Sequence, residues 1–336
     1  SMVTLRDLLR SASRTFAIGI EQLPGILCDA ATVAYLLLRV SDYLEDNEDM
    51  DAESKVSLLN TWVEILNGNA VPEELTAQIQ DANTSNPDAV VAQHAGDILA
   101  RLATLPREVR EIITDHVIHS SLGMARWVAR GPQVDDETDL DDYMFEVAGR
   151  VGYLLTHLFA WYSTAIHHRK DRLLPLAREF GLALQTVNVI RGLRKDYERG
   201  WVFVPKQFLA QVNLTAQELF QPEYRAQAIQ VLDMLADKAE RHMRAALTCV
   251  KTLPPWQHRI RLACIFPLMF AIRTLAISRR NAQVFENEAK ISRAEVRRIV
   301  SDSMLWGWSN VWLDRYYQKL NVVPSSGPFA YDIDIH

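Results

Sequence analysis

Hydrophobic residues recur every three to four positions along nearly the whole chain, and strand-like alternation between turn signals is hard to find. That period places apolar side chains on one face of a helix. Prolines fall where such helices would begin or end, because proline disrupts a helix interior. The pattern predicts an all-α protein with helices near 25–46, 52–67, 88–103, 107–130, 138–167, 172–198, 223–251, 257–282 and 293–319.

The chain of 336 residues shows no internal repeat, low-complexity tract or linker that would separate domains. A chain of this length can form one large domain with its own core. We therefore expect a single helical domain over residues 1–336, with a loop over 82–88 and an irregular tail over 322–336.

The predicted helix 25–46 has an unusual composition. From Ala30 to Leu38 it is almost entirely apolar, which is typical of a helix that is buried on every side. It then runs directly into Arg39 and a cluster of acidic residues that ends at Asp49. Because an acidic cluster adds nothing to a buried helix as a structural element, it indicates a metal site.

Charge and cysteine content narrow the classes of function. The formal net charge is −6 and no basic stripe occurs, which argues against nucleic-acid binding. An acidic chain that binds phosphate needs local arginines or metal ions to supply positive charge. Cys28, Cys249 and Cys264 are not at metal-ligand spacing, so we expect free thiols in a reducing compartment.

The sequence suggests no targeting or membrane-spanning segment. The N-terminal residues lack the pattern of a signal peptide. The most apolar stretch, Leu262 to Ile277, contains Arg273 and is shorter than the roughly 18 residues that a span needs. We expect a cytoplasmic protein, and a peripheral contact of its surface with a membrane stays open.

The first candidate site lies at the end of helix 25–46. Residues three and four positions apart share a helix face, so Asp42, Glu45 and Asp46 should converge. Their like charges destabilise the helix unless a cation binds between them. Mg²⁺ suits such a site, since it takes one or two carboxylates together with water and substrate phosphate. The alternative is a solvated acidic helix end.

The second candidate site lies in residues 185–199. Asn188, Gly192 and Asp196 are spaced by four and share one helix face, while Arg191 and Lys195 share another. The amide and carboxylate suit a second metal position, and the two cations suit diphosphate oxygens. An ordinary charged helix end is the alternative.

Two glycines mark a third segment. Gly149 and Gly152 fall inside the predicted helix 138–167, where each costs about 1 kcal/mol relative to alanine. Such a cost has a reason in packing or in space for a ligand. Close approach of a second helix and room for a bulky apolar chain both stay open.

These segments resemble, in this order, the motifs of the squalene/phytoene synthase family, and in detail those of its squalene synthases. The resemblance extends from about residue 10 to residue 293. The sequences that carry it are SRTF at 13–16, YLLLRVSDYLED at 35–46, VAGRVGYLLTHLF at 147–159, GLALQTVNVIRGLRKDYERGWVFVP at 181–205 and CIFPLMFAIRTLAISRRNAQVFENEAK at 264–290.

The resemblance implies a single-domain isoprenoid-synthase helix bundle with a central active-site cavity. It implies a Mg²⁺-dependent prenyltransferase that joins two farnesyl diphosphates head to head through presqualene diphosphate. The second half of that reaction forms squalene with hydride from NADPH. The implied partner is a prenyl diphosphate substrate.

Position by position, the resemblance also implies roles for individual residues. The metal ligands would be Asp42, Glu45, Asp46, Asn188 and Asp196. The substrate diphosphate would contact Ser13, Arg14, Thr15, Arg39, Arg191, Lys195 and Lys290, and the cofactor would contact Asn188, Arg191 and Lys290. Catalytic roles would fall to Tyr143, Arg39 and Tyr35, with Tyr143 handling a proton in the first half-reaction.

The chain departs from the family pattern within the second acidic motif and close to Lys290. Gly192 stands where the second acidic motif usually has its first aspartate, and Lys195 where it has a glutamate. Ser292 stands where squalene synthases have an arginine, which leaves the use of NADPH open. A non-reductive product (dehydrosqualene, phytoene, hydroxysqualene or presqualene diphosphate), terpene cyclisation, and a non-catalytic prenyl-binding or assembly protein therefore stay open.

Overall fold

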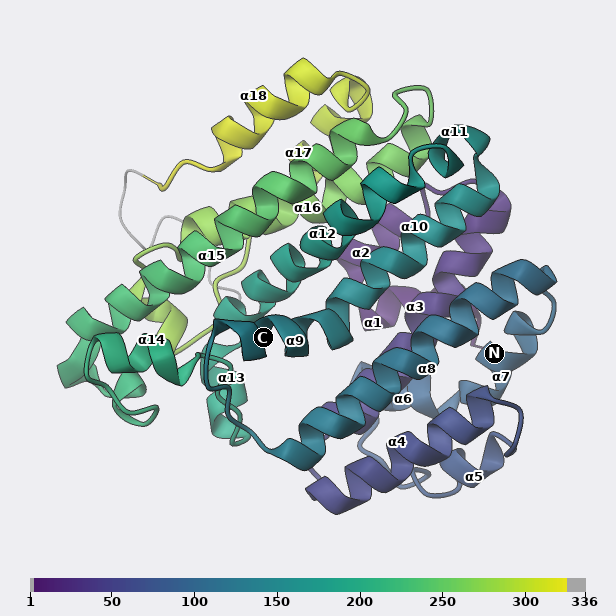
Figure 1. Ribbon diagram of the computed structural model, residues 1–336, viewed down its shortest axis with the longest axis horizontal. Coiled ribbons are helices and arrows are strands. Elements are labelled where there is room, and N and C mark those ends of the chain that lie inside the picture. The colour runs from purple at the N-terminus through teal and green to yellow at the C-terminus, as the bar shows by residue number, and fades with distance from the viewer. Residues whose placement is uncertain (1–2, 325–336) are drawn as a thin grey trace. The chain divides into compact units, whose positions relative to one another are not determined.

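The computed structural model describes residues 3–324, and all regular elements within that range are helical apart from an isolated bridge between Gln133 and Val202 (Figure 1). The predicted all-α fold class is therefore confirmed. The helices group into two compact units, which are described separately below. The single domain stays a prediction, and residues 325–336 of the predicted tail lie outside the described residues.

The first unit comprises the chain up to Gly131 together with residues 150–171. Its central element is α3, which begins after Pro24 and is buried along most of its length. α3 packs against α6, α7 and α8, and α4 runs beside α8 (Figure 1). The helices are α1 (Leu5–Ala12), α2 (Arg14–Ile20), α3 (Gly25–Asp46), α4 (Ala52–Leu66), α5 (Glu73–Thr76), α6 (Pro87–Gln93), α7 (Ala95–Leu102), α8 (Arg107–Arg130), α10 (Arg150–Tyr162) and α11 (Thr164–His167).

A buried hydrogen-bond cluster fixes the C-terminal part of α3. The indole Nε1 of Trp62 on α4 donates to Ser41 Oγ at 3.0 Å, and Ser41 Oγ lies 2.8 Å from Ser121 Oγ on α8. All three residues are fully buried. Polar groups in an apolar core need such partners, so the cluster sets the register of the three helices. It lies one residue before Asp42 and so holds the first candidate site in place.

The second unit comprises residues 132–149 and the chain from Arg172 onward. α15 and α16 lie side by side, and α16 also packs against α17 and α18 (Figure 1). The elements are α9 (Glu137–Met144), a π-helical turn (Phe145–Gly149), α12 (Lys170–Arg191), α13 (Leu193–Glu198), α14 (Lys206–Gln211), α15 (Arg225–Thr252), α16 (His258–Ser278), α17 (Arg293–Trp306), α18 (Asn310–Leu320) and 3₁₀ turns at Glu218–Phe220, Pro222–Tyr224 and Ala282–Phe285.

Within residues 3–324, α16 is the one helix long and apolar enough to cross a membrane by length and composition. Of its most apolar window, 78% is buried, which is typical of a core helix. The helix also carries two buried arginines. Arg261 donates to the backbone carbonyls of Val250 and Trp308, and Arg273 bonds Glu295 and carbonyls at the end of α18.

Several predicted helices are interrupted and are therefore shorter than expected. The predicted helix 138–167 is divided by the π-helical turn and by Ser163, whose side chain caps α11. The predicted helix 293–319 is divided where Ser309 caps α18, and 88–103 is divided at His94. The prediction also missed α1 and α2, whose N-caps are Thr4 and Ser13.

Close packing accounts for Gly149. A Cβ on Gly149 would lie 2.7 Å from Phe145 Cδ2 and 3.1 Å from Leu182 Cδ1. On the facing helix, a Cβ on Gly181 would lie 2.8 Å from the carbonyl carbon of Ala148, and closer still to its oxygen. The structure thus favours helix approach over ligand space as the reason for glycine at 149.

We predict that Gly181→Ala destabilises the protein by about 1–3 kcal/mol, because the added methyl group meets backbone atoms that cannot move aside. Gly96→Ala is the matched control. Its Cβ would meet only Pro72 Cβ at an ordinary 3.7 Å, so alanine should stabilise α7 by about 0.5–1 kcal/mol. Thermal unfolding followed by circular dichroism measures both changes, and equal effects of the two substitutions would contradict the packing explanation.

Candidate functional site

The first acidic motif is organised around the guanidinium of Arg39 on α3. Arg39 Nη1 donates to Asp42 Oδ2 at 3.0 Å. Its Nε and Nη2 donate to the two carboxylate oxygens of Asp88, the Nε bond being 2.9 Å long. Asp88 is buried in the first turn of α6. Arg39 therefore forms a bidentate ion pair with Asp88 and a single hydrogen bond with Asp42.

Burial and neighbouring charge raise the pKa of Asp42 to about 7. Burial is the larger cause, and the carboxylates of Asp46 and Asp88 add to it, while Arg39 opposes the shift. The pKa of Arg39 is raised despite its burial, because Asp42 and Asp88 favour its charged form. The end of α3 thus concentrates negative charge that a divalent cation would relieve.

The remaining residues of the first motif take different positions. Asp46 is near enough to Asp42 to affect its ionisation, whereas Glu45 is buried. Tyr35, one turn before Arg39, is half-buried; burial raises its pKa, and a side-chain hydrogen bond from Ser13 opposes that shift. Tyr35, Arg39, Asp42 and Asp46 therefore share one face of α3, from its middle to its C-terminal end.

The start of α2 lies against this end of α3. The ring of Phe16 lies 5.5 Å from the ring of Tyr35, between centroids. Ser13 caps α2, and its Oγ lies 3.3 Å from Thr15 Oγ1. Arg14 is exposed. Three residues at 13–15 were predicted to contact the diphosphate. Of these, Ser13 is the one whose side chain contacts Tyr35 of the first motif.

The second acidic motif spans the break between α12 and α13. The helix is interrupted at Gly192, and a Cβ there would lie 3.0 Å from Asp196 Oδ2 and 3.1 Å from the carbonyl oxygen of Asn188. The predicted shared face of Asn188, Gly192 and Asp196 is therefore present. Arg199 Nε donates to Asp196 Oδ1 at 3.1 Å. Burial raises the pKa of Asp196, and Arg199 opposes that shift.

Two of the predicted anion-binding cations share one carboxylate. Arg191 Nη2 donates to Glu288 Oε1, and Lys290 Nζ lies 3.8 Å from Glu288 Oε2. The Nε of Arg191 is buried without a hydrogen-bond partner among the described residues. An unsatisfied buried donor is favourable for an incoming anion. Lys195, the third predicted anion-binding cation in the second unit, is exposed on α13.

Tyr143 lies on α9, where it is buried and stacks on Phe203 with 4.6 Å between ring centroids. Phe203 in turn stacks on Trp201, and the Arg199 guanidinium lies 6.0 Å from the Phe203 ring centroid. Arg199 therefore contacts both Asp196 and the aromatic residues that support Tyr143. The structure connects Tyr143 to the second motif through this stack.

The donor sets of both motifs fit Mg²⁺, although neither forms a complete cage. Among residues 3–324, no three acidic, histidine or cysteine side chains lie close enough to hold an ion by themselves. Mg²⁺ does not require that, because substrate phosphate and water complete its coordination. Carboxylates whose pKa is raised by burial, as at Asp42 and Asp196, gain from such an ion, and at Asp42 neighbouring carboxylates add to the shift.

A pocket of about 250 Å³ beside α14 is separate from these residues. Val202, Val204, Leu209 and Leu214 are among its lining side chains. None of the predicted catalytic, metal or diphosphate residues lines it. We therefore do not assign it to the candidate site.

Three partners of the candidate residues were not identified from the sequence: Asp88, Arg199 and Glu288. Asp88 is 49 positions from Arg39, and Glu288 is 97 positions from Arg191, so no helical spacing relates them. Arg199 could have been identified from the sequence, because it follows Asp196 by three positions and so shares a helix face with it.

Comparisons with known proteins agree with this geometry. A squalene/phytoene synthase family model matches residues 9–295. The squalene synthase of Homo sapiens is 26% identical over 332 residues, covering 98% of this chain and 76% of the relative. The squalene synthase of Yarrowia lipolytica is 27% identical over 322 residues, with 94% and 69% covered.

Solved structures share the fold. A ligand complex of TcSQS superposes with a TM-score of 0.82 at 23% identity, covering 98% of this chain and 93% of that chain. A dehydrosqualene synthase complex superposes with a TM-score of 0.58 at 19% identity, covering 94% and 95%. At these identities the likeness shows that the fold is similar to theirs.

The raised pKa of Asp42 predicts how stability depends on pH. Because its folded-state pKa, about 7, lies above the ordinary value of 3.8, ionising Asp42 opposes folding. Its contribution is favourable below about pH 4 and is lost as the pH rises through about 7. Asp42→Asn cannot ionise, so in metal-free buffer it should gain stability relative to the unchanged chain as the pH rises through this window, by about 1.4 kcal/mol for each pH unit at most.

Thermal unfolding at a series of pH values, in chelator, measures this difference. Asp49→Asn, which removes one carboxyl group at an exposed position just beyond α3, is the matched control. Added Mg²⁺ should raise the melting temperature of the unchanged chain more than that of Asp42→Asn. A difference for Asp42→Asn that does not vary with pH would contradict the assigned environment.

Proposed function

Since this chain belongs to the squalene/phytoene synthase family of prenyltransferases, we propose that it joins two farnesyl diphosphates head to head and converts the product to squalene. The family condenses prenyl diphosphates in this head-to-head manner. The choice of farnesyl substrate and squalene product is supported by the similarity to squalene synthases over nearly the whole chain. The observation that carries the proposal is the charged end of α3, where Arg39, Asp42 and Asp46 lie beside Tyr35.

We propose that each unit supplies ligands for Mg²⁺: Asp42 and Asp46, with Glu45 supporting them, in the first unit, and Asn188 and Asp196 in the second. When bound, Mg²⁺ supplies Lewis-acid stabilisation to the leaving diphosphate. Arg39 limits the charge repulsion between the carboxylates at the end of α3. Its bidentate pair with Asp88 keeps the guanidinium in a fixed orientation, so that little side-chain entropy is lost when an anion binds.

Tyr143 is proposed to hold or move a proton at its phenol oxygen. Its ring is fixed by stacking on Phe203, and α9 holds its backbone. Fixed orientation matters for proton transfer, because the donor must lie within hydrogen-bond distance of the reacting group. Tyr35 and Arg39 are proposed to orient the diphosphate from α3.

We propose NADPH as the reductant of the second half-reaction, with Arg191 and Lys290 contacting its phosphates and Asn188 nearby. NADPH, when bound, supplies hydride. The unpartnered Nε of Arg191 and the shared Glu288 support an anion site, since a phosphate could replace the carboxylate between the two cations.

One observation favours a non-reductive product as the second candidate. Ser292 caps α17: its Oγ accepts the Glu295 N–H at 3.1 Å, and the Glu295 carboxylate accepts the Ser292 N–H. Arginine in the related squalene synthases is thus replaced by a residue with a structural role. Without that cation, dehydrosqualene or another product formed without hydride becomes the alternative.

Incubating the protein with farnesyl diphosphate and Mg²⁺, with and without NADPH, decides between the two candidates. Gas chromatography with mass spectrometry identifies the hydrocarbons. Squalene that appears only with NADPH supports the proposal. Dehydrosqualene, an alcohol or a cyclic product regardless of NADPH supports the second candidate. Release of no diphosphate at all would overturn both.

We predict that Asp42→Ala and Asp46→Ala each lower the rate of diphosphate release about 100-fold or more, because each removes a ligand that stabilises developing charge. Glu48→Ala is the matched control, since Glu48 is an exposed acid two positions after Asp46. It should retain activity within about twofold. Near-normal turnover by either aspartate variant would contradict the metal assignment.

We also propose that the protein contacts a membrane through a tryptophan patch on the second unit. Each side chain of the patch is at least half exposed: Trp256, Met304, Leu305, Trp306, Trp308 and Val311. The loop before α16 and the end of α17 meet here, since the ring of His258 bonds the Met304 carbonyl at 3.1 Å. Tryptophan favours the interface between lipid and water.

Local charge favours an anionic lipid surface as the occupant of the patch. Residues 251–259 and 293–320 contain seven Lys or Arg and three Asp or Glu, whereas the whole chain has a net charge of −6. A surface with this excess of positive charge is attracted to anionic headgroups. Contact with a bilayer also suits an enzyme whose product is a hydrocarbon.

We predict that the protein co-sediments with vesicles of phosphatidylglycerol and phosphatidylcholine, and that Trp306→Ala with Trp308→Ala lowers the bound fraction roughly fivefold or more. Raised salt should weaken binding as well. Val71→Ala removes an equally exposed apolar side chain from the first unit and should leave binding unchanged. Equal binding by both variants would contradict the assignment of the patch.

A further inference from the structure

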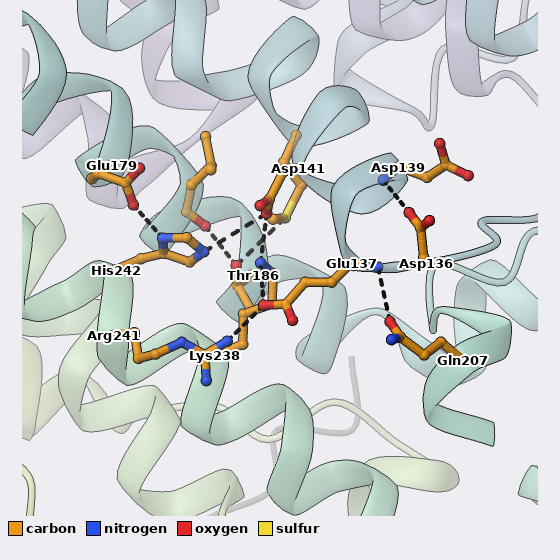
Figure 2. A network of polar contacts seen from close by, with 12 residues as sticks. Asp136, Glu137, Asp139, Asp141, Glu179, Thr186, Gln207, Lys238, Arg241 and His242 are labelled. Atoms are coloured by element: carbon orange, nitrogen blue, oxygen red, sulfur yellow. Dashed lines mark hydrogen bonds and ion pairs between the residues drawn. The ribbon is translucent and has the colours of Figure 1, made fainter. Parts of the chain in front are cut away.

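A buried lysine on α15 is not explained by the proposed chemistry. Lys238 is fully buried, yet its Nζ lies 2.5 Å from Asp141 Oδ1 and 3.1 Å from Glu137 Oε1 (Figure 2). Both carboxylates belong to α9 and are one helical turn apart, so they share the face that meets the lysine. Lys238 thus joins α9 to α15.

The surrounding charges complete a network around this lysine (Figure 2). Arg241, one turn further along α15, donates to Glu137 at 2.6 Å. His242 contacts Glu179 on α12 through Nδ1, and its Nε2 lies 3.9 Å from Asp141 Oδ1. Of these cations, Lys238 is the one that bonds Glu137 and Asp141 together.

α9 presents two faces with different partners. One face carries Glu137, Asp141 and Met144, and Met144 Sδ accepts a hydrogen bond from Thr186 on α12. Tyr143, two positions after Asp141, points to another side and stacks on Phe203. A change in the tilt or rotation of α9 would therefore move the Tyr143 ring.

The structure after α9 does not fix that orientation by itself. α-Helical hydrogen bonding gives way to the π-helical turn Phe145–Gly149 directly after Met144. A π turn interrupts the regular helix ladder and is often found at functional sites. The polar contacts of α9 with α15 therefore add to the packing contacts that hold its direction.

Stability alone does not account for a lysine at this position. Removing an ammonium group from water is costly, and an apolar side chain of similar volume often stabilises a core as well or better. A cation that bonds two carboxylates on one helix face instead specifies a single orientation of that helix.

We propose that Lys238 is a positioning residue, which sets the orientation of α9 and thereby the position of the Tyr143 phenol. The proposal rests on the proposed function in assigning proton transfer to Tyr143. Lys238 itself contacts neither substrate nor cofactor in this role. Its effect on the reaction passes through Asp141 and α9.

Fluorine NMR of the protein labelled with 3-fluorotyrosine tests this without any enzymatic activity. The chain has ten tyrosines, and the resonance lost in Tyr143→Phe identifies Tyr143. Lys238→Met should shift or broaden that resonance. Arg241→Met, which loses a bond to the same Glu137 but leaves Lys238 and Asp141 joined, should not. An unchanged Tyr143 resonance in folded Lys238→Met would overturn the proposal.

A double-mutant cycle tests the effect on turnover. Lys238→Met should lower kcat for diphosphate release about tenfold with KM within about twofold, whereas Arg241→Met should stay within about twofold. In a Tyr143→Phe background, Lys238→Met should add less than about twofold, because the group it positions is already gone. Full multiplication of the two effects would overturn the proposal.

Asp141→Asn provides a second variant should Lys238→Met fail to fold. It weakens the bond from Lys238 to α9 and leaves the lysine paired with Glu137, so no lone charge is buried. The same shift of the Tyr143 resonance is expected, and its absence would overturn the proposal. If the unchanged protein releases no diphosphate, the proposed function fails, while the fluorine measurement still decides the role of Lys238.

Discussion

Carboxylates at the end of a buried helix require a cation, and the first unit is arranged to provide one. α3 is apolar and buried over most of its length, and ends in Asp42, Glu45 and Asp46. Arg39 supplies positive charge there, and its guanidinium bonds both Asp42 and Asp88. The raised pKa of Asp42 reflects first its burial and then the negative charges of Asp46 and Asp88. The buried hydrogen bonds of Ser41 with Trp62 and Ser121 hold this part of α3 in place, so Asp42 cannot move out into solvent.

In the second unit as well, the cations of the candidate site are paired with carboxylates. Glu288 is shared by Arg191 and Lys290, and Arg199 is tied to Asp196. An anion that binds there replaces an existing partner. The exchange lowers the gain in affinity, but the side chains are ordered beforehand, so less conformational entropy is lost on binding. On the proposed function, this preordering would let an acidic protein bind diphosphate without a large positive field.

Much of the fold followed from the sequence, because helical periodicity is a local property. The bounds of α3 and α8 agree with prediction for that reason. The shared face of Asn188, Gly192 and Asp196 also follows from helical spacing, whereas the break at Gly192 required the backbone itself. The predicted helix 138–167 failed at the π turn, for which periodicity carries no signal. Asp88 and Glu288 could not be found, because their partners are distant along the chain and tertiary packing alone brings them together. The metal, diphosphate and cofactor roles themselves stay predictions.

The cap of α17 has a consequence for anyone who would redesign the region around Lys290. Glu295 uses one carboxylate oxygen to bond the Ser292 N–H and the other to bond Arg273, which also holds carbonyls at the end of α18. Ser292, Glu295 and Arg273 therefore form a chain of hydrogen bonds that joins α17, α16 and the end of α18. An arginine in place of Ser292 would bring the missing charge but would lose the hydroxyl that caps α17, at a cost of about 1 kcal/mol. Arg293, the exposed neighbouring residue, already carries a positive charge, and changes to its side chain would leave these hydrogen bonds in place.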